Sequence, residues 1–378
     1  MKAPAKSSAS SSRGTSPAVA EPGADGSAGF FGALAEHNHE QVSFFQEAST
    51  GYRGIIAIHD TTLGPALGGT RFWRYPTDAD AFVDALRLSR GMTYKAAVAG
   101  LNLGGGKSVI IGDNRTTNRE PIFRAHGRHV ESLGGRYITA EDVGTSTADM
   151  EFIRAETSHV TGLMGKSGDP SPVTAFGVYR GMKAAAKHRW GSDTLTGKTI
   201  AVQGCGHVGY FLCKLLHEEG AKLVVTDIEP ARVKAVTQDF GAAAVATGEI
   251  YGQRADIFAP CALGAVINDD TIPLLKAEIV AGAANNVLAE DRHGVALETK
   301  GLTYAPDYVI NGGGLINVNA ELHGWSLARA RNKAGEIYDT ILRVFEIARD
   351  EKIPSYKAAD RLAERRIAAI AKVRQNFV

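Results

Sequence analysis

The spacing of hydrophobic residues predicts alternating strands and helices from about residue 30 onward. An apolar run at 54–59 predicts a strand, and apolar residues at helical spacing in 78–92 predict a helix. A further strand is predicted at 108–111, directly after the glycine cluster Gly104–Gly106. The chain up to about residue 162 therefore mixes strands with helices.

Short apolar runs and helical stretches alternate more regularly in the second half of the chain. A helical stretch at 172–191 is followed by a strand at 199–203, a helix at 207–219, and strands at 222–226, 257–259, 278–281 and 309–310. Such alternation is typical of a parallel sheet with helices on both faces. Beyond residue 326 the pattern predicts two long helices, 329–350 and 355–375. A chain of 378 residues suits two domains.

The first 28 residues differ from the rest. They are rich in Ser, Ala, Pro and Gly and carry almost no bulky apolar side chains. Burial cannot offset the entropy lost on ordering such a segment, so residues 1–28 are expected to form a disordered tail. An organelle address is the alternative, although the segment lacks an Arg-rich amphipathic pattern.

Charge and cysteine usage exclude several classes of protein. Lys and Arg number 42 against 41 Asp and Glu, so the formal net charge of +1 is too small to attract nucleic acid or an anionic membrane. Three cysteines without CxxC spacing argue against a disulfide scaffold and against a metal site. No apolar run approaches the roughly 20 residues that span a bilayer. We therefore expect a cytoplasmic protein with no nucleic-acid or membrane partner and no metal.

The late basic residues Arg361, Arg365 and Arg366 predict a solvated or subunit-contacting helix face.

A glycine-rich turn indicates a dinucleotide site. Gly204-x-Gly206-x-x-Gly209 follows a predicted strand and opens a predicted helix, and Asp227 ends the next strand. This context is the dinucleotide-binding fingerprint, in which backbone N–H groups and the helix dipole hold the pyrophosphate. Asp227 would accept hydrogen bonds from the adenosine ribose hydroxyls and repel a 2′-phosphate, so NAD is the expected cofactor. The loop also contains Cys205, His207 and Val208. The alternative is a turn that needs glycine for packing alone.

A second glycine cluster surrounds two lysines, Lys95 in GMTYK and Lys107 in LGGGK. Three glycines before Lys107 predict uncovered backbone beside its amine. Two converging ammonium groups lower each other's pKa, and burial acts in the same direction. A neutral lysine can act as a base, and a charged one can bind a carboxylate. Two surface lysines flanking a turn fit the sequence equally well.

Asp142, at a strand-to-loop junction, is either an acid–base group or a capping residue.

Several longer segments carry a family resemblance. They are GPALGGTRF (64–72), GMTYK (91–95), GLNLGGGK (100–107), RYITAEDVGT (136–145), GDPSPVTAFGV (168–178), APCALGA (259–265), AGAANN (281–286) and YAPDYVINGGG (304–314). Through them the sequence resembles the glutamate/leucine/phenylalanine/valine dehydrogenase family, and within it the leucine and phenylalanine branch. The resemblance extends from about residue 40 to 375.

The resemblance implies an α/β protein of two domains. The N-terminal α/β substrate domain is expected at 29–165 and a Rossmann dinucleotide-binding domain at 166–329. The C-terminal helices, 330–378, are expected to return to the first domain, with the active site in the interdomain cleft. Members of the family are homo-oligomers, so one is expected here.

The resemblance also implies a reaction, the reversible oxidative deamination of an L-amino acid to a 2-oxo acid and ammonia with NAD as hydride acceptor. By similarity, Lys95 binds the substrate α-carboxylate. Lys107 activates the attacking water and stabilises the carbinolamine oxygen, and Asp142 exchanges protons with the amino group. The other residues implied are Gly68 and Gly69 at the substrate cleft, Thr161 and Thr174 at the nicotinamide end, and Asn285 in the cofactor loop.

Side-chain specificity depends on a few pocket positions. The glutamate members carry a lysine where this chain has Leu67 and a serine that aligns with Val318, so a glutamate side chain would lack polar partners. Ala140 matches the leucine type, whereas Leu315 matches some phenylalanine-type enzymes. We expect leucine and other branched chains as substrates, with phenylalanine as the alternative, followed by valine or tryptophan.

Two other functions remain compatible with a dinucleotide fold. A hydroxy-acid dehydrogenase would catalyse reduction without ammonia. A non-catalytic NAD-binding regulator would not need Lys95, Lys107 and Asp142, and the presence of all three argues against it.

Overall fold

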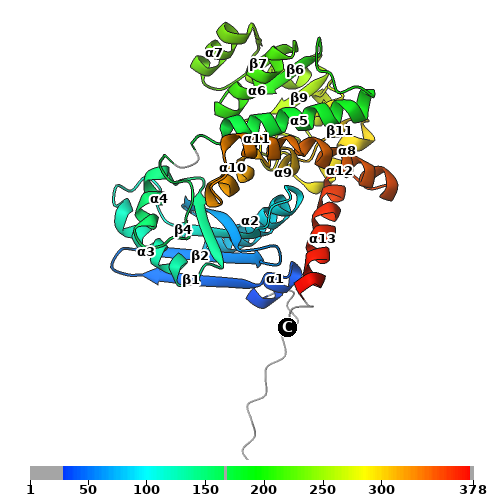
Figure 1. Cartoon of the computed structure of the whole chain (residues 1–378). Helices are drawn as coiled ribbons and strands as arrows, with labels where there is room; N and C mark the ends of the chain where they lie inside the picture. Colours follow the sequence, from blue (N-terminus) through cyan, green and yellow to red (C-terminus); the bar gives the residue numbers. More distant parts are fainter. Residues whose placement is uncertain (1–28, 166–167, 375–378) are drawn as a thin grey trace, which may run out of the picture.

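The computed structural model describes residues 29–165 and 168–374, which form two domains, each built on its own sheet (Figure 1). The N-terminal elements are α1 (Phe30–Glu36), β1 (Gln41–Glu47), β2 (Tyr52–Asp60), β3 (Ala66–Trp73), α2 (Asp78–Val98), β4 (Gly104–Ile111), α3 (Arg119–Glu131), β5 (Tyr137–Glu141) and α4 (Thr147–Arg154). The predicted tail, 1–28, and the end of the last predicted helix, 375, lie outside the described residues.

The remaining elements form the second sheet and the helices around it. They are α5 (Ser171–Trp190), β6 (Thr199–Gln203), α6 (His207–Glu218), β7 (Lys222–Thr226), α7 (Pro230–Phe240), β8 (Ala243–Ala244), β9 (Ile257–Pro260), β10 (Ile279–Val280), α8 (Asp291–Thr299), β11 (Thr303–Tyr304), α9 (Asp307–Ile310), α10 (Gly313–Leu322), α11 (Leu327–Gly335), α12 (Ile337–Glu351) and α13 (Ser355–Arg374). Two short 3₁₀ helices, Thr247–Gly252 and Ile272–Leu274, lie in the connections.

The N-terminal sheet has the order β1-β2-β4-β3-β5, with β3, β4 and β5 parallel and β1 and β2 antiparallel. Side chains alternate between the faces of a strand. On one face Val109 of β4 packs with Phe82 and Leu86 of α2. On the other face Ile110 packs with Phe123 of α3. The sheet is therefore covered by helices on both sides.

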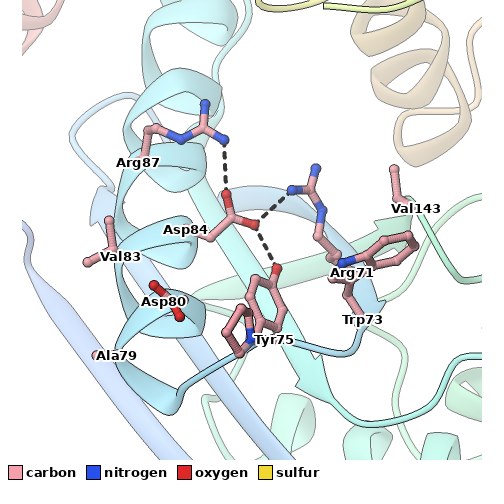
Figure 2. Close-up of a pocket in the computed structure, with 10 residues that line it drawn as sticks. Arg71, Trp73, Tyr75, Ala79, Asp80, Val83, Asp84, Arg87 and Val143 are labelled. Atoms are coloured by element: carbon pink, nitrogen blue, oxygen red, sulfur yellow. Dashed lines mark hydrogen bonds and ion pairs between the residues drawn. The ribbon is translucent and has the colours of Figure 1, made fainter.

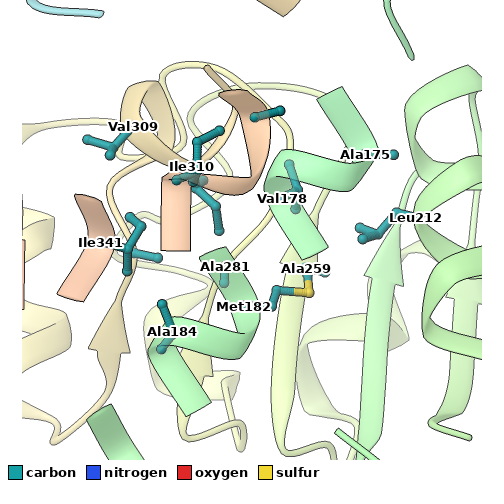
Figure 3. Close-up of a cluster of buried hydrophobic side chains, with 14 of the residues drawn as sticks. Ala175, Val178, Met182, Ala184, Leu212, Ala259, Ala281, Val309, Ile310 and Ile341 are labelled. Atoms are coloured by element: carbon teal, nitrogen blue, oxygen red, sulfur yellow. The ribbon is translucent and has the colours of Figure 1, made fainter. Parts of the chain in front are cut away.

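The second sheet is fully parallel, in the order β11-β10-β9-β6-β7-β8. The chain runs outward from β6 in both directions, so the strand order reverses beside β6. In parallel sheets this reversal leaves a crevice at the carboxyl ends of the strands, where dinucleotides bind. Helix α5 covers the sheet, and Figure 3 shows its Val178 and Met182 near Ala259 and Ala281 in one apolar cluster. The predicted α/β fold with a Rossmann domain is confirmed.

Two predicted elements are wrong. Residues 309–310 are not a strand but part of α9, in which the N–H of Ile310 donates to the carbonyl of Pro306. An apolar pair is too short to separate a buried strand from a buried helix turn, and the outer strand is β11 instead. The single helix expected at 329–350 is divided at Glu336 into α11 and α12, directly after Gly335. Glycine weakens helices, which accounts for the break at this place.

Two element boundaries change the setting of the lysines. Helix α2 continues past residue 92 to Val98, so Lys95 lies in its last turn rather than beside a turn. Strand β4 begins at Gly104, so the glycines before Lys107 belong to the strand. Both lysines are therefore carried by regular elements.

The C-terminal helices contact both domains. Helices α11 and α12 pack on α5. The return to the N-terminal domain is made by α13, which packs on α2 and in Figure 1 extends from the second domain down along the N-terminal domain. Arg366 of α13 donates hydrogen bonds to the carbonyls of Ala96, Ala97 and Leu101 at the end of α2. The prediction of a solvated or subunit-contacting face is wrong at Arg366, because its guanidinium donates to carbonyls at the end of α2 in the same chain.

No helix among the described residues is long and apolar enough to cross a membrane.

A buried histidine predicts acid sensitivity of the N-terminal domain. His126 is fully buried between Tyr52, whose hydroxyl lies 2.9 Å from Nδ1, and Thr70, whose hydroxyl lies 3.1 Å from Nε2. Burial lowers the pKa of His126 to about 3. Below about pH 6.5 the unfolded chain binds a proton that the folded chain rejects, so stability is lost as the pH falls. The loss is up to about 1.4 kcal/mol of unfolding free energy per pH unit.

The measurement is the urea midpoint of unfolding at pH 7.5 and pH 5 for the wild type and for His126→Gln. The shift between the two pH values should be smaller in the variant. A matched control, His207→Gln, changes an exposed histidine and should retain the wild-type shift. Equal shifts in all three proteins would refute the prediction.

Candidate active site

The predicted catalytic groups share one face of the N-terminal sheet. Gly69 and Arg71 are two positions apart on β3 and therefore face the same side. Lys107 lies on the neighbouring strand β4, and Ala140 of β5 is paired with Gly69. This is the face covered by α2, whose last turn carries Lys95. The alternation of the strands thus brings residues that are distant in sequence to one surface.

The space beside the glycines that precede Lys107 is filled by neighbouring atoms. A Cβ on Gly105 would lie 2.1 Å from the backbone nitrogen of Thr93 in α2, and one on Gly106 would lie 2.7 Å from the ring of Tyr137. The expectation of uncovered backbone beside the amine is therefore wrong. Gly105 allows α2 to pack directly on β4, which sets the turn bearing Lys95 over the strand bearing Lys107, and Gly106 makes room for Tyr137 on the opposite face of the sheet.

Lys107 is paired with Asp142. Its Nζ lies 2.6 Å from Asp142 Oδ2, and only 6% of the lysine side chain is exposed. Burial lowers the pKa of Lys107, and the charge of Asp142 opposes that effect. Burial raises the pKa of Asp142, but Lys107 and then Arg71 outweigh it, so its pKa is lowered. At neutral pH Asp142 is therefore an anion, and it pairs with a lysine whose pKa is lowered by burial.

Lys95 lies where the two domains meet. Its Nζ donates to Oδ1 of Asn285 at 3.0 Å, which joins α2 to the loop that follows β10. Burial lowers the pKa of Lys95 to about 8, Asp307 raises it and Lys107 lowers it. The charge of Lys107 therefore lowers the pKa of Lys95 as expected, but burial is the larger cause.

The loop carrying Asn285 is fixed by residues that the sequence analysis did not single out. Asn311 donates through Nδ2 to Asn285 Oδ1 at 2.8 Å, and the N–H of Val287 donates to Oδ2 of Asp307 at 2.7 Å. Asp307 and Asn311 lie in the YAPDYVINGGG segment, which was used for recognition alone. The strand predicted at 309–310 hid their position, because Asp307 and Asn311 in fact begin and follow α9, directly after the outer strand β11.

The glycine loop has the geometry that the fingerprint requires. Gly204 adopts a φ of +104°, and a Cβ on Gly209 would lie 2.1 Å from the carbonyl oxygen of Gly204. At Gly206 the nearest heavy atom to an added Cβ is a guanidinium nitrogen of Arg232, 3.9 Å away. Gly204 and Gly209 are thus needed by the fold, whereas Gly206 leaves open space at the start of α6. That space fits a pyrophosphate held by the helix N-terminus.

Asp227 is held in place by the backbone. Its Oδ2 accepts from the N–H of Cys205 at 2.7 Å and its Oδ1 from the N–H of Glu229 at 2.9 Å. Arg232 approaches Oδ1 at 3.9 Å. The carboxylate is therefore fixed beside the glycine loop. His207 is exposed and lies 3.5 Å from Asp169, and Val208 is half-buried in α6.

The two predicted threonines differ. Thr161 is fully buried, and its Oγ1 has no hydrogen-bond partner among the described residues. Thr174 donates to the carbonyl of Pro170 at 2.9 Å. An unsatisfied buried hydroxyl is costly, so Thr161 fits a position that a ligand completes.

The predicted pocket residues lie on both domains. Leu67 is 1% exposed, and it belongs to the same large apolar cluster as Leu315 on α10. Val318 packs against that cluster, and Ala140 is half-buried. A Cβ on Gly68 would overlap the carbonyl of Gly106, and one on Gly69 would lie 2.7 Å from Cβ of Asp142. Gly69 thus makes room for Asp142.

Known proteins are similar in sequence to nearly the whole chain. A profile described as "Glu/Leu/Phe/Val dehydrogenase, dimerisation domain" matches residues 39–159, and one described as "Glutamate/Leucine/Phenylalanine/Valine dehydrogenase" matches 165–231 and 225–374. Leucine dehydrogenase of Geobacillus stearothermophilus is 58% identical over 351 residues, covering 92% of this chain and 96% of that protein. Valine dehydrogenase of Streptomyces coelicolor is 50% identical over 336 residues, covering 87% and 92%.

A solved structure agrees as well. The crystal structure of L-tryptophan dehydrogenase from Nostoc punctiforme superimposes with a TM-score of 0.83 at 48% identity, covering 90% of this chain and 99% of that one. The chain therefore belongs to the glutamate/leucine/phenylalanine/valine dehydrogenase family of dinucleotide-dependent amino acid dehydrogenases.

Proposed function

We propose that the protein catalyses the reversible NAD-dependent oxidative deamination of an apolar L-amino acid, with leucine and the other branched-chain amino acids as preferred substrates. One observation carries the proposal: the buried Lys107–Asp142 pair lies on the sheet face covered by α2, and Lys95 of α2 reaches the dinucleotide domain at Asn285. Acid–base groups and an anion-binding cation thus stand beside a dinucleotide fold.

Lys95 binds the substrate α-carboxylate. With a pKa of about 8 the lysine is largely protonated at neutral pH, and an adjacent carboxylate favours the charged form further. Its bond to Asn285 places the bound carboxylate at the domain boundary. The α-carbon of the substrate is then directed toward the dinucleotide domain.

Lys107 and Asp142 perform the proton transfers. Asp142 accepts a proton from the substrate amino group and returns one to the nitrogen when ammonia leaves, and Lys107 in its neutral form takes a proton from the water that attacks the substrate imine. The bound dinucleotide supplies the hydride acceptor. The Nζ–Oδ2 distance of 2.6 Å allows the two residues to share a proton between steps.

Apolar surroundings favour a branched-chain side chain over glutamate. Leu67 and Val318 offer no partner to a side-chain carboxylate, and leaving such a charge unpaired costs several kcal/mol. The 58% identity with a leucine dehydrogenase, against 50% with a valine dehydrogenase and 48% with L-tryptophan dehydrogenase, supports leucine. Leu315 supports phenylalanine as the second candidate.

We also propose a homo-oligomer. Phe30, Phe31 and Phe44 are exposed by 66%, 88% and 57%, and Phe44 lies on β1, which has one unpaired edge in the described sheet. Exposed aromatic side chains beside a free strand edge are typical of an interface. The profile matched by residues 39–159 is described as a dimerisation domain.

An absorbance assay at 340 nm tests the function. The protein with NAD is expected to form NADH most rapidly with L-leucine, L-valine or L-isoleucine, more slowly with L-phenylalanine and L-tryptophan, and least with L-glutamate. The reverse reaction with 4-methyl-2-oxopentanoate should require ammonia. Reduction without ammonia would identify a hydroxy-acid dehydrogenase, and no turnover with any substrate would support a regulator.

Lys107→Ala tests the assigned chemistry. Loss of a positioned acid–base group lowers rates by about 10²- to 10⁴-fold, so kcat should fall in that range while NADH still binds. Rates come from the same assay, and binding from NADH fluorescence. A matched control is Lys187→Ala, an exposed lysine on α5. Turnover near the wild-type level in Lys107→Ala would contradict the assignment.

Asp227→Asn tests the preference for NAD. Asparagine can still accept hydrogen bonds from the loop but no longer repels a 2′-phosphate, and Arg232 lies near to bind one. The ratio of kcat/KM for NAD to that for NADP should fall about tenfold or more, because a charge contact with phosphate is worth over 1 kcal/mol. An unchanged ratio would place the discrimination elsewhere.

A further inference from the structure

Arg71 joins the candidate acid–base residue to a second carboxylate. Its Nε donates to Asp142 Oδ2 at 3.1 Å, and its Nη1 donates to Asp84 Oδ2 at 2.7 Å. Only 21% of the arginine side chain is exposed. Asp142 Oδ2 is also the atom that binds Lys107 at 2.6 Å. One carboxylate oxygen thus receives two cationic donors from neighbouring strands.

Asp84 is itself firmly held. Besides Arg71 it accepts from the hydroxyl of Tyr75 at 2.6 Å and from Arg87 Nη2 at 2.9 Å, as Figure 2 shows. Its side chain is 15% exposed and lies on α2, the helix that also carries Lys95. The guanidinium of Arg71 is planar and its donors have fixed directions, so holding one side of it at Asp84 also fixes the donor that reaches Asp142. The orientation of Asp142 is therefore set from α2 through Arg71.

Resting on the proposed dehydrogenase function, we propose that Arg71, held by Asp84, is the positioning residue that turns the Asp142 carboxylate toward Lys107. Without Arg71, Lys107 is the one side-chain partner that the carboxylate keeps among the described residues, and a single partner leaves the carboxylate freer to rotate about its own bonds. With Arg71 in place, Oδ2 is confined to the point where both donors reach it.

Arg71 also acts through its charge. It opposes the effect of burial on Asp142, lowering the pKa of that carboxyl, and it lowers the pKa of Lys107. The charged and titratable groups around Asp142 are Lys107, Arg71, Lys95, Asp84, Tyr137 and the neighbouring Glu141. Among the cations of this set, Arg71 is the one bonded to both aspartates.

A hollow of about 590 Å³ opens on the outer side of Arg71. Trp73, Tyr75, Val83 and Val143 line it, and Trp73 and Val83 are 46% and 58% exposed. Figure 2 shows Arg71 with Asp84 on one side and Trp73 and Val143 on the other. Truncation of Arg71 would therefore leave a space that small solutes can enter from the solvent. This access makes chemical rescue possible.

Arg71→Ala is the central variant. With Asp142 misplaced, kcat should fall about tenfold or more, while NADH binding stays unchanged because the glycine loop is on the other domain. Ethylguanidine, added at millimolar concentration, should restore part of kcat by occupying the hollow beside Asp84 and Asp142. Ethylurea, of similar shape but neutral, should not. If Arg71 contributed to stability alone, ethylguanidine and ethylurea would have the same effect on the kcat of Arg71→Ala.

The pH profile separates charge from geometry. Asp142 loses a neighbouring cation in Arg71→Ala, which raises the pKa of its carboxyl. The acid limb of the kcat/KM profile should therefore shift to higher pH by about one pH unit. Arg71→Lys keeps the charge, so its acid limb should stay near that of the wild type. Its kcat should remain low, because one ammonium cannot reproduce the two-sided bridge.

Asp84→Asn tests the anchor and replaces Arg71→Ala if that variant does not fold. It should lower kcat without raising the acid limb, because the cation at Arg71 remains. Arg74→Ala is the matched control: Arg74 pairs with Asp113 on the surface and is 77% exposed, so its kinetics should match the wild type.

Two outcomes would overturn the proposal. One is wild-type kcat and pH profile in Arg71→Ala. The other is a loss of kcat that ethylguanidine does not relieve, with an unmoved acid limb. If the wild type itself oxidised no amino acid, the proposed function would fail instead, and that result is obtained before any variant is compared.

Discussion

A lysine ammonium buried between a sheet and a helix requires an anionic partner, because removing the charge from water costs several kcal/mol. Lys107 meets this condition through Asp142 at 2.6 Å, and the construction of the N-terminal domain follows from it. Gly69 leaves room for Asp142, and Gly105 lets α2 lie directly on the strand of Lys107. The buried pair is thus made possible by residues without side chains.

The same helix ties the pair to the rest of the molecule. Helix α2 anchors Arg71 through Asp84 and presents Lys95 to Asn285 of the second domain. Its end is capped by Arg366 of α13, which comes from the far end of the chain. A movement of the second domain relative to the first would therefore act on Lys95 through Asn285 and, at the end of α2, through Arg366. This arrangement is suited to closing a site around a bound amino acid before reaction.

Local patterns predicted the dinucleotide domain well and the contacts within the candidate active site less well. The strands 199–203 and 222–226 are as predicted, because a buried parallel strand shows as an uninterrupted apolar run. Glycines were misread near the lysines, since a glycine in a helix or strand resembles one in a turn. The contacts of Arg71 with Asp142 and of Arg366 with α2 join residues 71 and up to 270 positions apart, which no local pattern reveals. Roles for these residues follow only from the fold.

The most direct test of this account is the titration of the two lysine amines themselves. Protein labelled with ¹³C at lysine Cε is titrated by NMR, and the two resonances are assigned with Lys95→Arg and Lys107→Arg. Burial should place both pKa values below the ordinary 10.5, with Lys95 near 8. Titration of both amines at about 10.5, like that of exposed lysines, would contradict the account.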